Sequence, residues 1–169
     1  VDGILTADPR LVKTAKLLDK ISYKEASELA TFGAKVLHPR TIHPAVKAGI
    51  PVRVLNSFNL KSEGTLILEK YESKNPVTAI SSKTKVTLVN IYSTEMLLSK
   101  GFLSKIFEVF TRHNISVDLV SVSEVSVSVT LDNKDSIVSV VKELSEFASV
   151  NTSEDFGMVS LIGEGVVTS

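Results

Sequence analysis

The stretch Glu-Val-Ser-Val-Ser-Val-Thr-Leu, residues 124–131, alternates apolar and polar side chains without a break. In an extended chain, successive side chains point to opposite faces of the sheet. The three valines and the leucine therefore share one face, and the serines and the threonine share the other. The pattern predicts a β-strand whose apolar face is covered by other elements of the fold.

Hydrophobic periodicity predicts five more elements around this strand. They are a strand at 86–89, a helix at 103–110, a strand at 116–121, a helix at 137–147 and a strand at 148–152. Each helix has one apolar face, which needs a sheet to cover it. The order strand, helix, strand, strand, helix, strand is that of a ferredoxin-like βαββαβ sandwich, an α+β fold. The run at 158–163 resembles the first strand of this module and predicts the start of a second repeat.

The first 68 residues have a different, α/β pattern. Ser22 and Glu25 have the spacing of a capping box, so a helix is expected to begin there and to end near Gly33. Turn and strand signals predict the other elements of this half. These are a surface loop over residues 1–10, a short helix framed by Pro39 and Pro44, and strands at 51–55 and 65–68.

A polar stretch at 69–83 separates the two halves and contains the pair Asn75-Pro76. This composition is typical of a linker between domains. We therefore expect three segments: an α/β domain with its linker at 1–74, the ferredoxin-like domain at 75–155, and the first strand of a second such domain at 156–169.

The composition argues against several classes of function. The 19 lysines and arginines equal the 19 aspartates and glutamates, so no net field attracts nucleic acid or an anionic membrane surface. No apolar run approaches the roughly 20 residues of a membrane helix. The chain has no cysteine, which excludes disulfides and thiolate metal sites and fits a reducing compartment such as the cytosol or an organelle stroma.

No standard catalytic or metal-binding motif is present in the sequence, and its three histidines are scattered. Arg10 and Lys35 are loop cations of the kind that bind phosphates, although taken alone each is more consistent with a solvated surface charge. The residues 99–103, Ser-Lys-Gly-Phe-Leu, precede a helix whose free amides can bind a carboxylate, or they form an ordinary cap. Asp118 and Glu124 end two consecutive strands, where they either converge on an ammonium group or are plain turn acids.

Several separated motifs resemble those of the aspartate kinases, members of the amino-acid-kinase superfamily. Residues 1–10, Val-Asp-Gly-Ile-Leu-Thr-Ala-Asp-Pro-Arg, are similar to the family's nucleotide loop. Residues 32–40, Phe-Gly-Ala-Lys-Val-Leu-His-Pro-Arg, are similar to its late catalytic signature. The segments at 101–103, 114–118 and 123–126 resemble the first ACT module of the lysine-inhibited subgroup. The three expected segments are then the end of an amino-acid-kinase domain, a first ACT domain and the start of a second.

The resemblance implies a parent enzyme that transfers the γ-phosphoryl group of ATP to the β-carboxylate of aspartate, assisted by Mg²⁺. This is the first step of lysine, threonine and methionine synthesis. The resemblance also implies that Leu5, Arg10 and Lys35 line the ATP site, with Arg10 and Lys35 facing the phosphates. Some relatives have a tyrosine at the position of Leu5. The resemblance assigns no catalytic residue and no metal ligand to this sequence.

For the ACT region, the resemblance implies an allosteric site for lysine between two chains of a homo-oligomer, a dimer or a tetramer. The residues that it places around lysine are Met96, Ser99, Phe102, Leu103, Ser116, Val117, Asp118, Ser123, Glu124 and Val125. Amides at the helix start and serines would bind the carboxylate, and Asp118 or Glu124 would bind an ammonium group. Lysine is then expected to inhibit by binding a less active arrangement more tightly.

The sequence begins with Val1 rather than methionine and lacks the family's Lys-Phe-Gly-Gly-Thr-Ser motif, so we expect a fragment that is inactive alone. Two alternatives remain open. A non-catalytic ACT subunit would bind an effector and a partner enzyme, but it has no need of a nucleotide loop. A threonine-sensing kinase would keep the chemistry and change the effector.

Overall fold

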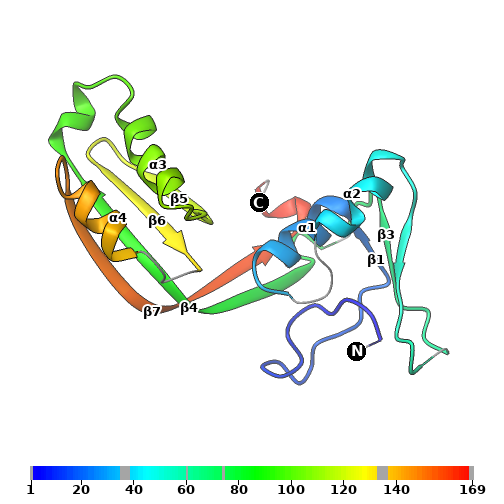
Figure 1. The fold of residues 1–169 in the computed structure, drawn as a ribbon. Helices are drawn as coiled ribbons and strands as arrows, with labels where there is room; N and C mark the ends of the chain where they lie inside the picture. The colour runs from blue at the N-terminus through cyan, green and yellow to red at the C-terminus, as the bar shows by residue number, and fades with distance from the viewer. Residues whose placement is uncertain (1, 35–38, 60, 74, 133–136, 168–169) are drawn as a thin grey trace. The chain divides into compact units, whose positions relative to one another are not determined.

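The computed structural model describes residues 2–34, 39–59, 61–73, 75–132 and 137–167, and it divides into two compact units. The first unit comprises Val1–Lys83 and Val159–Ser169, and the second unit comprises Thr84–Met158. Figure 1 shows the elements of each. Both units mix helices and sheets, as the sequence predicts.

The first unit contains a small mixed sheet and two helices. Its elements are β1 (Lys20–Ser22), α1 (Tyr23–Thr31), α2 (Pro39–Lys47), β2 (Val52–Val54), β3 (Thr65–Leu68) and the short 3-10 helix η2 (Glu164–Val167). The strand order is β1-β3-β2, with β1 parallel and β2 antiparallel to β3. The core of this unit consists largely of isoleucines, including Ile4, Ile21 and Ile67.

The capping box predicted at the start of α1 is present. The Ser22 hydroxyl accepts the amide N–H of Glu25 at 3.2 Å, and the Glu25 carboxylate accepts the amide N–H of Ser22 at 3.1 Å. Glu25 is only 1% exposed. Because a buried carboxylate needs donors, its second oxygen accepts the hydroxyl of Thr78 at 2.6 Å. The cap therefore also fixes Thr78, which directly precedes the strand that begins at Ala79.

The second unit has the predicted βαββαβ order. Its elements are β4 (Ala79–Tyr92), the 3-10 helix η1 (Thr94–Leu97), α3 (Phe102–Arg112), β5 (Leu119–Val122), β6 (Ser126–Leu131), α4 (Ile137–Leu144) and β7 (Ser149–Ile162). The sheet order is β5-β6-β4-β7, so β5 is an edge strand. Both helices cover one face of this sheet (Figure 1). Strand β4 begins in the first unit and ends in the second. Strand β7 begins in the second unit and ends in the first.

Residues 126–131 of the alternating stretch form β6. Val127, Val129 and Leu131 are fully buried against α3 and α4, as the two-residue period requires. On the opposite face, the hydroxyl of Ser128 donates to the side chain of Asn90 on β4 at 2.6 Å. The strand begins at Ser126, two residues later than expected, because Glu124 belongs to the turn after β5.

The strands at the ends of the second unit are longer than the sequence indicates. Strand β4 begins at Ala79, inside the expected linker. The expected strands at 148–152 and 158–163 are parts of one continuous strand, β7. Most β7 side chains are exposed in no regular alternation, so hydrophobic periodicity reveals only its two ends. The assignment of residues 156–169 to a second repeat stays a prediction.

Candidate functional site

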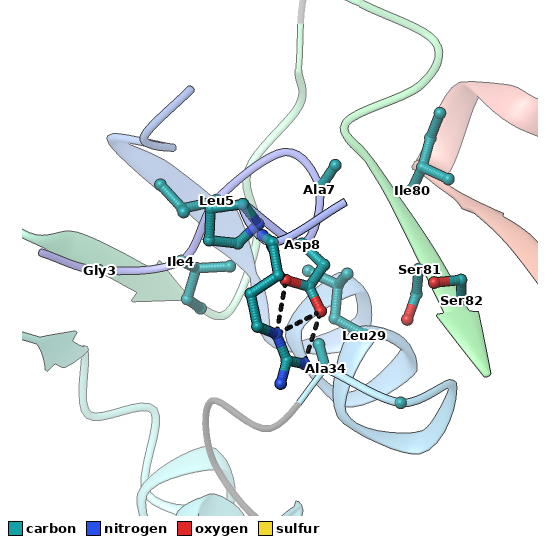
Figure 2. Close-up of a pocket in the computed structure, with 13 residues that line it drawn as sticks. Gly3, Ile4, Leu5, Ala7, Asp8, Leu29, Ala34, Ile80, Ser81 and Ser82 are labelled. Carbon is teal, nitrogen blue, oxygen red and sulfur yellow. Dashed lines mark hydrogen bonds and ion pairs between the residues drawn. The ribbon is translucent and has the colours of Figure 1, made fainter. Parts of the chain in front are cut away.

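The first candidate site is a pocket of about 330 Å³ in the first unit. Three segments form it: the N-terminal loop, the end of α1 and the beginning of β4 (Figure 2). The loop contributes residues between Gly3 and Arg10, α1 contributes Leu29, and β4 contributes Ile80 with its two following serines. The pocket is therefore built from segments far apart in the sequence.

Hydrogen bonds to Thr65 on β3 hold the N-terminal loop in place. The Thr65 hydroxyl accepts the amide N–H of Ile4 at 2.8 Å and donates to the carbonyl of Leu18 at 2.6 Å. Gly3 permits this close approach, because a Cβ atom there would lie 2.7 Å from the Thr65 hydroxyl oxygen. The loop is thus attached to the sheet rather than lying loosely over the surface.

The beginning of β4 is held as firmly as the loop. The amide of Ile80 donates to the carbonyl of Thr6 at 2.8 Å, which joins β4 directly to the loop. The Ser81 hydroxyl donates to the carbonyl of Phe32 at the end of α1 at 2.7 Å. These bonds fix all three walls of the pocket relative to one another.

Arg10 and Asp8 form a paired charge at this pocket (Figure 2). The guanidinium Nε donates to both carboxylate oxygens of Asp8, at 3.0 and 3.2 Å, and Nη2 donates to Oδ2 at 2.7 Å. These hydrogen bonds from Arg10 lower the pKa of the Asp8 carboxyl to about 2. Asp8 is therefore ionised at neutral pH, whereas the Arg10 side chain stays 82% exposed.

Two of the three predicted ATP residues, Leu5 and Arg10, line this pocket. Lys35, the third, lies outside the described residues. Ile80, Ser81 and Ser82 also line the pocket but were not predicted from the sequence, because they lie in the expected linker. Asp8 was not predicted either, although it belongs to the same Asp-Pro-Arg motif as Arg10.

The second candidate site is a pocket of about 460 Å³ in the second unit. It lies between η1, the start of α3 and the turn that joins β5 to β6. Six of the ten predicted effector residues line it: Met96, Ser99, Phe102, Leu103, Ser123 and Glu124. The sequence analysis did not predict Leu97 and Val122, which add apolar surface to the same pocket.

The N-terminus of α3 opens at this pocket without a side-chain cap. Its N-cap residue, Gly101, has φ 81° and ψ 8°, a left-handed conformation that glycine adopts easily. A helix N-terminus presents free N–H groups and partial positive charge, which favour an anion. Glu124 also lines this pocket and supplies negative charge. The pocket therefore offers a partner for an anionic group and a partner for a cationic group.

Residues that do not line the second pocket make contacts that hold its walls in place. The Phe102 ring packs edge-on against Phe147, with the centroids 5.7 Å apart, and the Lys105 ammonium lies 3.9 Å from the centre of the Phe147 ring. On the other side, the amide of Ser93 donates to the carbonyl of Val125 at 2.9 Å. This bond ties the end of β4 to the turn that carries Glu124.

The other four predicted effector residues, Ser116, Val117, Asp118 and Val125, do not line this pocket. The expectation that Asp118 and Glu124 converge is wrong within one chain. The amide of Asp118 bonds the carbonyl of Thr130 before β5 begins, whereas Glu124 follows the end of β5. At about 3.3 Å per residue, the strand between them spans on the order of 13 Å. Residues at opposite ends of one strand cannot close on one ligand.

The described residues were also compared with the requirements of a membrane span and of a metal site. Among the described residues, no helix has the length and apolar character needed to cross a membrane. No group of three or more histidines, cysteines, aspartates and glutamates within the described ranges is arranged to hold a metal ion.

Comparisons with known proteins match two parts of the chain to two different families. Residues 1–56 match the amino acid kinase family, and residues 89–146 match an ACT domain family. The chain is 45% identical to lysine-sensitive aspartokinase 3 of Escherichia coli over 96% of its own length and 38% of that protein. It therefore spans about two fifths of the length of this relative.

Solved structures of aspartokinases also resemble this chain. The chain resembles E. coli aspartokinase III in complex with aspartate and ADP, described as the R-state, with a TM-score of 0.89 and 44% identity. That match covers 100% of this chain and 40% of the other. The T-state structure, in complex with lysine and aspartate, matches with a TM-score of 0.85 and 46% identity over 96% of this chain and 38% of the other.

Proposed function

This chain is a homologue of the aspartokinases, and we propose that it is the part of an aspartate kinase that combines one side of the ATP site with a lysine-sensing ACT domain. The observation that carries the proposal is the second pocket. It gathers six residues predicted for lysine at the uncapped start of α3, in a chain 45% identical to a lysine-sensitive aspartokinase.

In the proposed parent enzyme, ATP phosphorylates the β-carboxylate of aspartate to give 4-phospho-L-aspartate and ADP. The first pocket contributes Leu5 to the nucleoside side and Arg10 to the phosphates, since a guanidinium is suited to phosphate oxygens. Lys35 is proposed to add a second cation. Mg²⁺ would arrive with ATP and neutralise phosphate charge. The enzyme would act in the cytosol, or in the plastid stroma of a plant or alga.

In the second unit, lysine is proposed to bind with its carboxylate at the N-terminus of α3. Its side-chain ammonium would face Glu124, because a carboxylate attracts a cation across a pocket of this size. Threonine fits the carboxylate end equally well, but it lacks the side-chain ammonium that lysine would direct at Glu124. This difference favours lysine as the effector.

A second copy of the chain explains why Asp118 was implied for the same site. Strand β5 is a sheet edge, and Leu119, Val120 and Val122 are 38 to 50% exposed. If two β5 edges pair in antiparallel fashion, the beginning of one strand lies beside the end of the other. Asp118 of one protomer then approaches Glu124 of its partner, and the effector site forms between them. We therefore propose a homodimer that forms through the ACT domains.

Calorimetric titration of the full-length gene product with lysine, and separately with threonine, tests this proposal. We expect lysine to bind and threonine not to bind, and we expect lysine to lower the rate of aspartate phosphorylation in a coupled assay. Inhibition by threonine alone would assign the enzyme to the threonine-sensing type. Effector binding without any ATP-dependent phosphorylation of aspartate would favour a regulatory subunit and overturn the kinase assignment.

A further inference from the structure

The carboxylate of Asp8 makes two kinds of hydrogen bond with the same residue, Arg10. Oδ1 accepts the backbone amide of Arg10 at 2.8 Å, which closes a turn through Pro9. Both carboxylate oxygens also accept the guanidinium, through Nε and Nη2. The Asp8 side chain therefore stabilises the backbone turn and also fixes the orientation of the Arg10 side chain.

The pairing leaves part of the arginine available for another anion. A guanidinium has five N–H donors in a rigid plane. Asp8 occupies the Nε donor and one donor of Nη2, so three donors, on Nη1 and Nη2, are not used in this pair. Because the guanidinium is planar and rigid, the bonds of Nε and Nη2 to Asp8 also fix the direction of the donors that remain. Both residues line the first pocket, and the dashed lines at the labelled Asp8 in Figure 2 mark its bonds.

We propose that Asp8 is a positioning residue, which holds Arg10 in the orientation that binds the ATP phosphates. This inference rests on the proposed nucleotide site and adds a residue to it. An arginine side chain has many rotamers, and a ligand that must select one of them binds more weakly than a ligand that meets the rotamer already formed. Asp8 acts through Arg10 and does not touch the nucleotide.

A simpler electrostatic effect predicts the opposite result. Asp8 is ionised at neutral pH, and a negative charge beside the pocket repels the phosphates of ATP. If Asp8 were only a counter-charge, its neutralisation would strengthen ATP binding. If it positions Arg10, its neutralisation weakens ATP binding. The sign of the change therefore distinguishes the two roles.

The variant Asp8→Asn separates the two functions of the side chain. Asparagine closes the same kind of turn, because its oxygen still accepts the Arg10 amide. It replaces the second carboxylate oxygen with an amide that donates, so Nη2 loses its acceptor. In the full-length gene product we expect the KM for ATP to rise roughly two- to fivefold, the effect of losing an exposed ion pair. The KM for aspartate and the Tm should not change.

A double-mutant cycle with Arg10→Ala shows whether Asp8 acts through the arginine. In the Arg10→Ala background, Asp8→Asn should produce no further rise in the KM for ATP. The matched control is Glu143→Gln in the second unit, which breaks an ion pair of Glu143 with Arg112. The Glu143 side chain is 30% exposed, as is that of Asp8. The control should leave the KM for ATP unchanged.

Three results would overturn the inference. The KM for ATP falls or stays constant in Asp8→Asn, it rises equally with and without Arg10, or Glu143→Gln raises it by the same factor. Each of these would leave the proposed function intact, because the wild-type enzyme still phosphorylates aspartate. Absence of ATP-dependent phosphorylation by the wild-type protein would instead overturn the proposed function and this inference with it.

Discussion

The two pockets of this chain differ in how complete they are. The first pocket is assembled within one chain, where side-chain and backbone hydrogen bonds join the N-terminal loop, α1 and β4. The second pocket brings together only part of its predicted set, and Asp118 lies at the far end of an exposed edge strand. The proposed side of the nucleotide site can therefore form within one copy of the chain, whereas the proposed effector site would depend on a partner.

This difference suggests how regulation would work in the proposed enzyme. If a ligand binds only the paired form, the ligand and the pairing stabilise each other by the same free energy. Lysine would therefore strengthen the dimer, and a weakened dimer would bind lysine poorly. ATP binding in the first pocket should be independent of both. The predictions below test this contrast, from the largest expected effect to the smallest.

The substitution Val120→Lys should separate the two pockets most clearly. Val120 is 47% exposed on the edge strand β5, and a charge buried there in a dimer would have no partner. We expect dimer affinity to fall by on the order of 3 kcal/mol, about a hundredfold, and lysine binding to be lost with it. Analytical ultracentrifugation and calorimetry measure the two effects.

The matched control for this substitution is Val138→Lys on α4, where the valine is 79% exposed and lies away from β5. It adds the same charge and should change neither the dimer nor lysine binding. ATP binding should be normal in both variants. A Val120→Lys protein that remains dimeric and binds lysine normally would show that β5 is not the interface.

Glu124→Gln should have the next largest effect. It removes the charge proposed to face the lysine ammonium and keeps the shape of the side chain. Since a hydrogen bond to a charged group contributes about 1.5–3 kcal/mol, we expect lysine affinity to fall roughly ten- to hundredfold. Calorimetry checks this value. Asp118→Asn should also weaken lysine binding by the dimer, and an unchanged lysine affinity in this variant would contradict a site shared between two chains.

Local patterns in the sequence were sufficient to predict much of the fold and part of each site. The strict alternation in β6 predicted its buried face, and the Ser22 and Glu25 spacing predicted the cap of α1. Arg10 and Glu124 were identified by motif, and both line pockets. These features depend on neighbours a few residues away, so the sequence records them directly.

Features that depend on distant segments were not predictable in the same way. Ile80 and Ser81 looked like linker residues, because their partners, Thr6 and Phe32, lie far away in the sequence. Asp118 and Glu124 were expected to meet, but residues meet across an antiparallel hairpin only when they are equally far from its turn. Glu124 is in the turn itself, and Asp118 is at the other end of β5.

Gly101→Ala tests the backbone at the start of α3. An added Cβ would meet no heavy atom within 4 Å, so the cost comes only from the left-handed φ of 81°. That conformation costs roughly 1–2 kcal/mol for alanine, which we expect as lower stability of the second unit and weaker lysine binding. Chemical denaturation and calorimetry measure both. Gly101→Asn is the matched control, because asparagine tolerates this conformation better and should lose less.

The two units also differ in whether a buried polar side chain lacks a hydrogen bond, and Thr87→Val tests that difference. In the first unit, buried polar side chains such as Glu25 and Thr65 make hydrogen bonds. In the second unit, the Thr87 hydroxyl is fully buried and has no hydrogen-bond partner within the part of the chain that the structure describes. Valine has nearly the same shape, so the substitution removes only an unsatisfied polar group.

We therefore expect Thr87→Val to raise the free energy of unfolding of the second unit by about 1 kcal/mol, measured by urea denaturation. Thr130→Val is its opposite control, because the Thr130 hydroxyl accepts the amide of Leu119 at 3.1 Å and its removal should destabilise. If Thr87→Val also destabilised the protein, the buried hydroxyl would have a partner, and the contrast between the two interiors would be wrong. Neither substitution should alter ATP binding, since both threonines lie in the second unit.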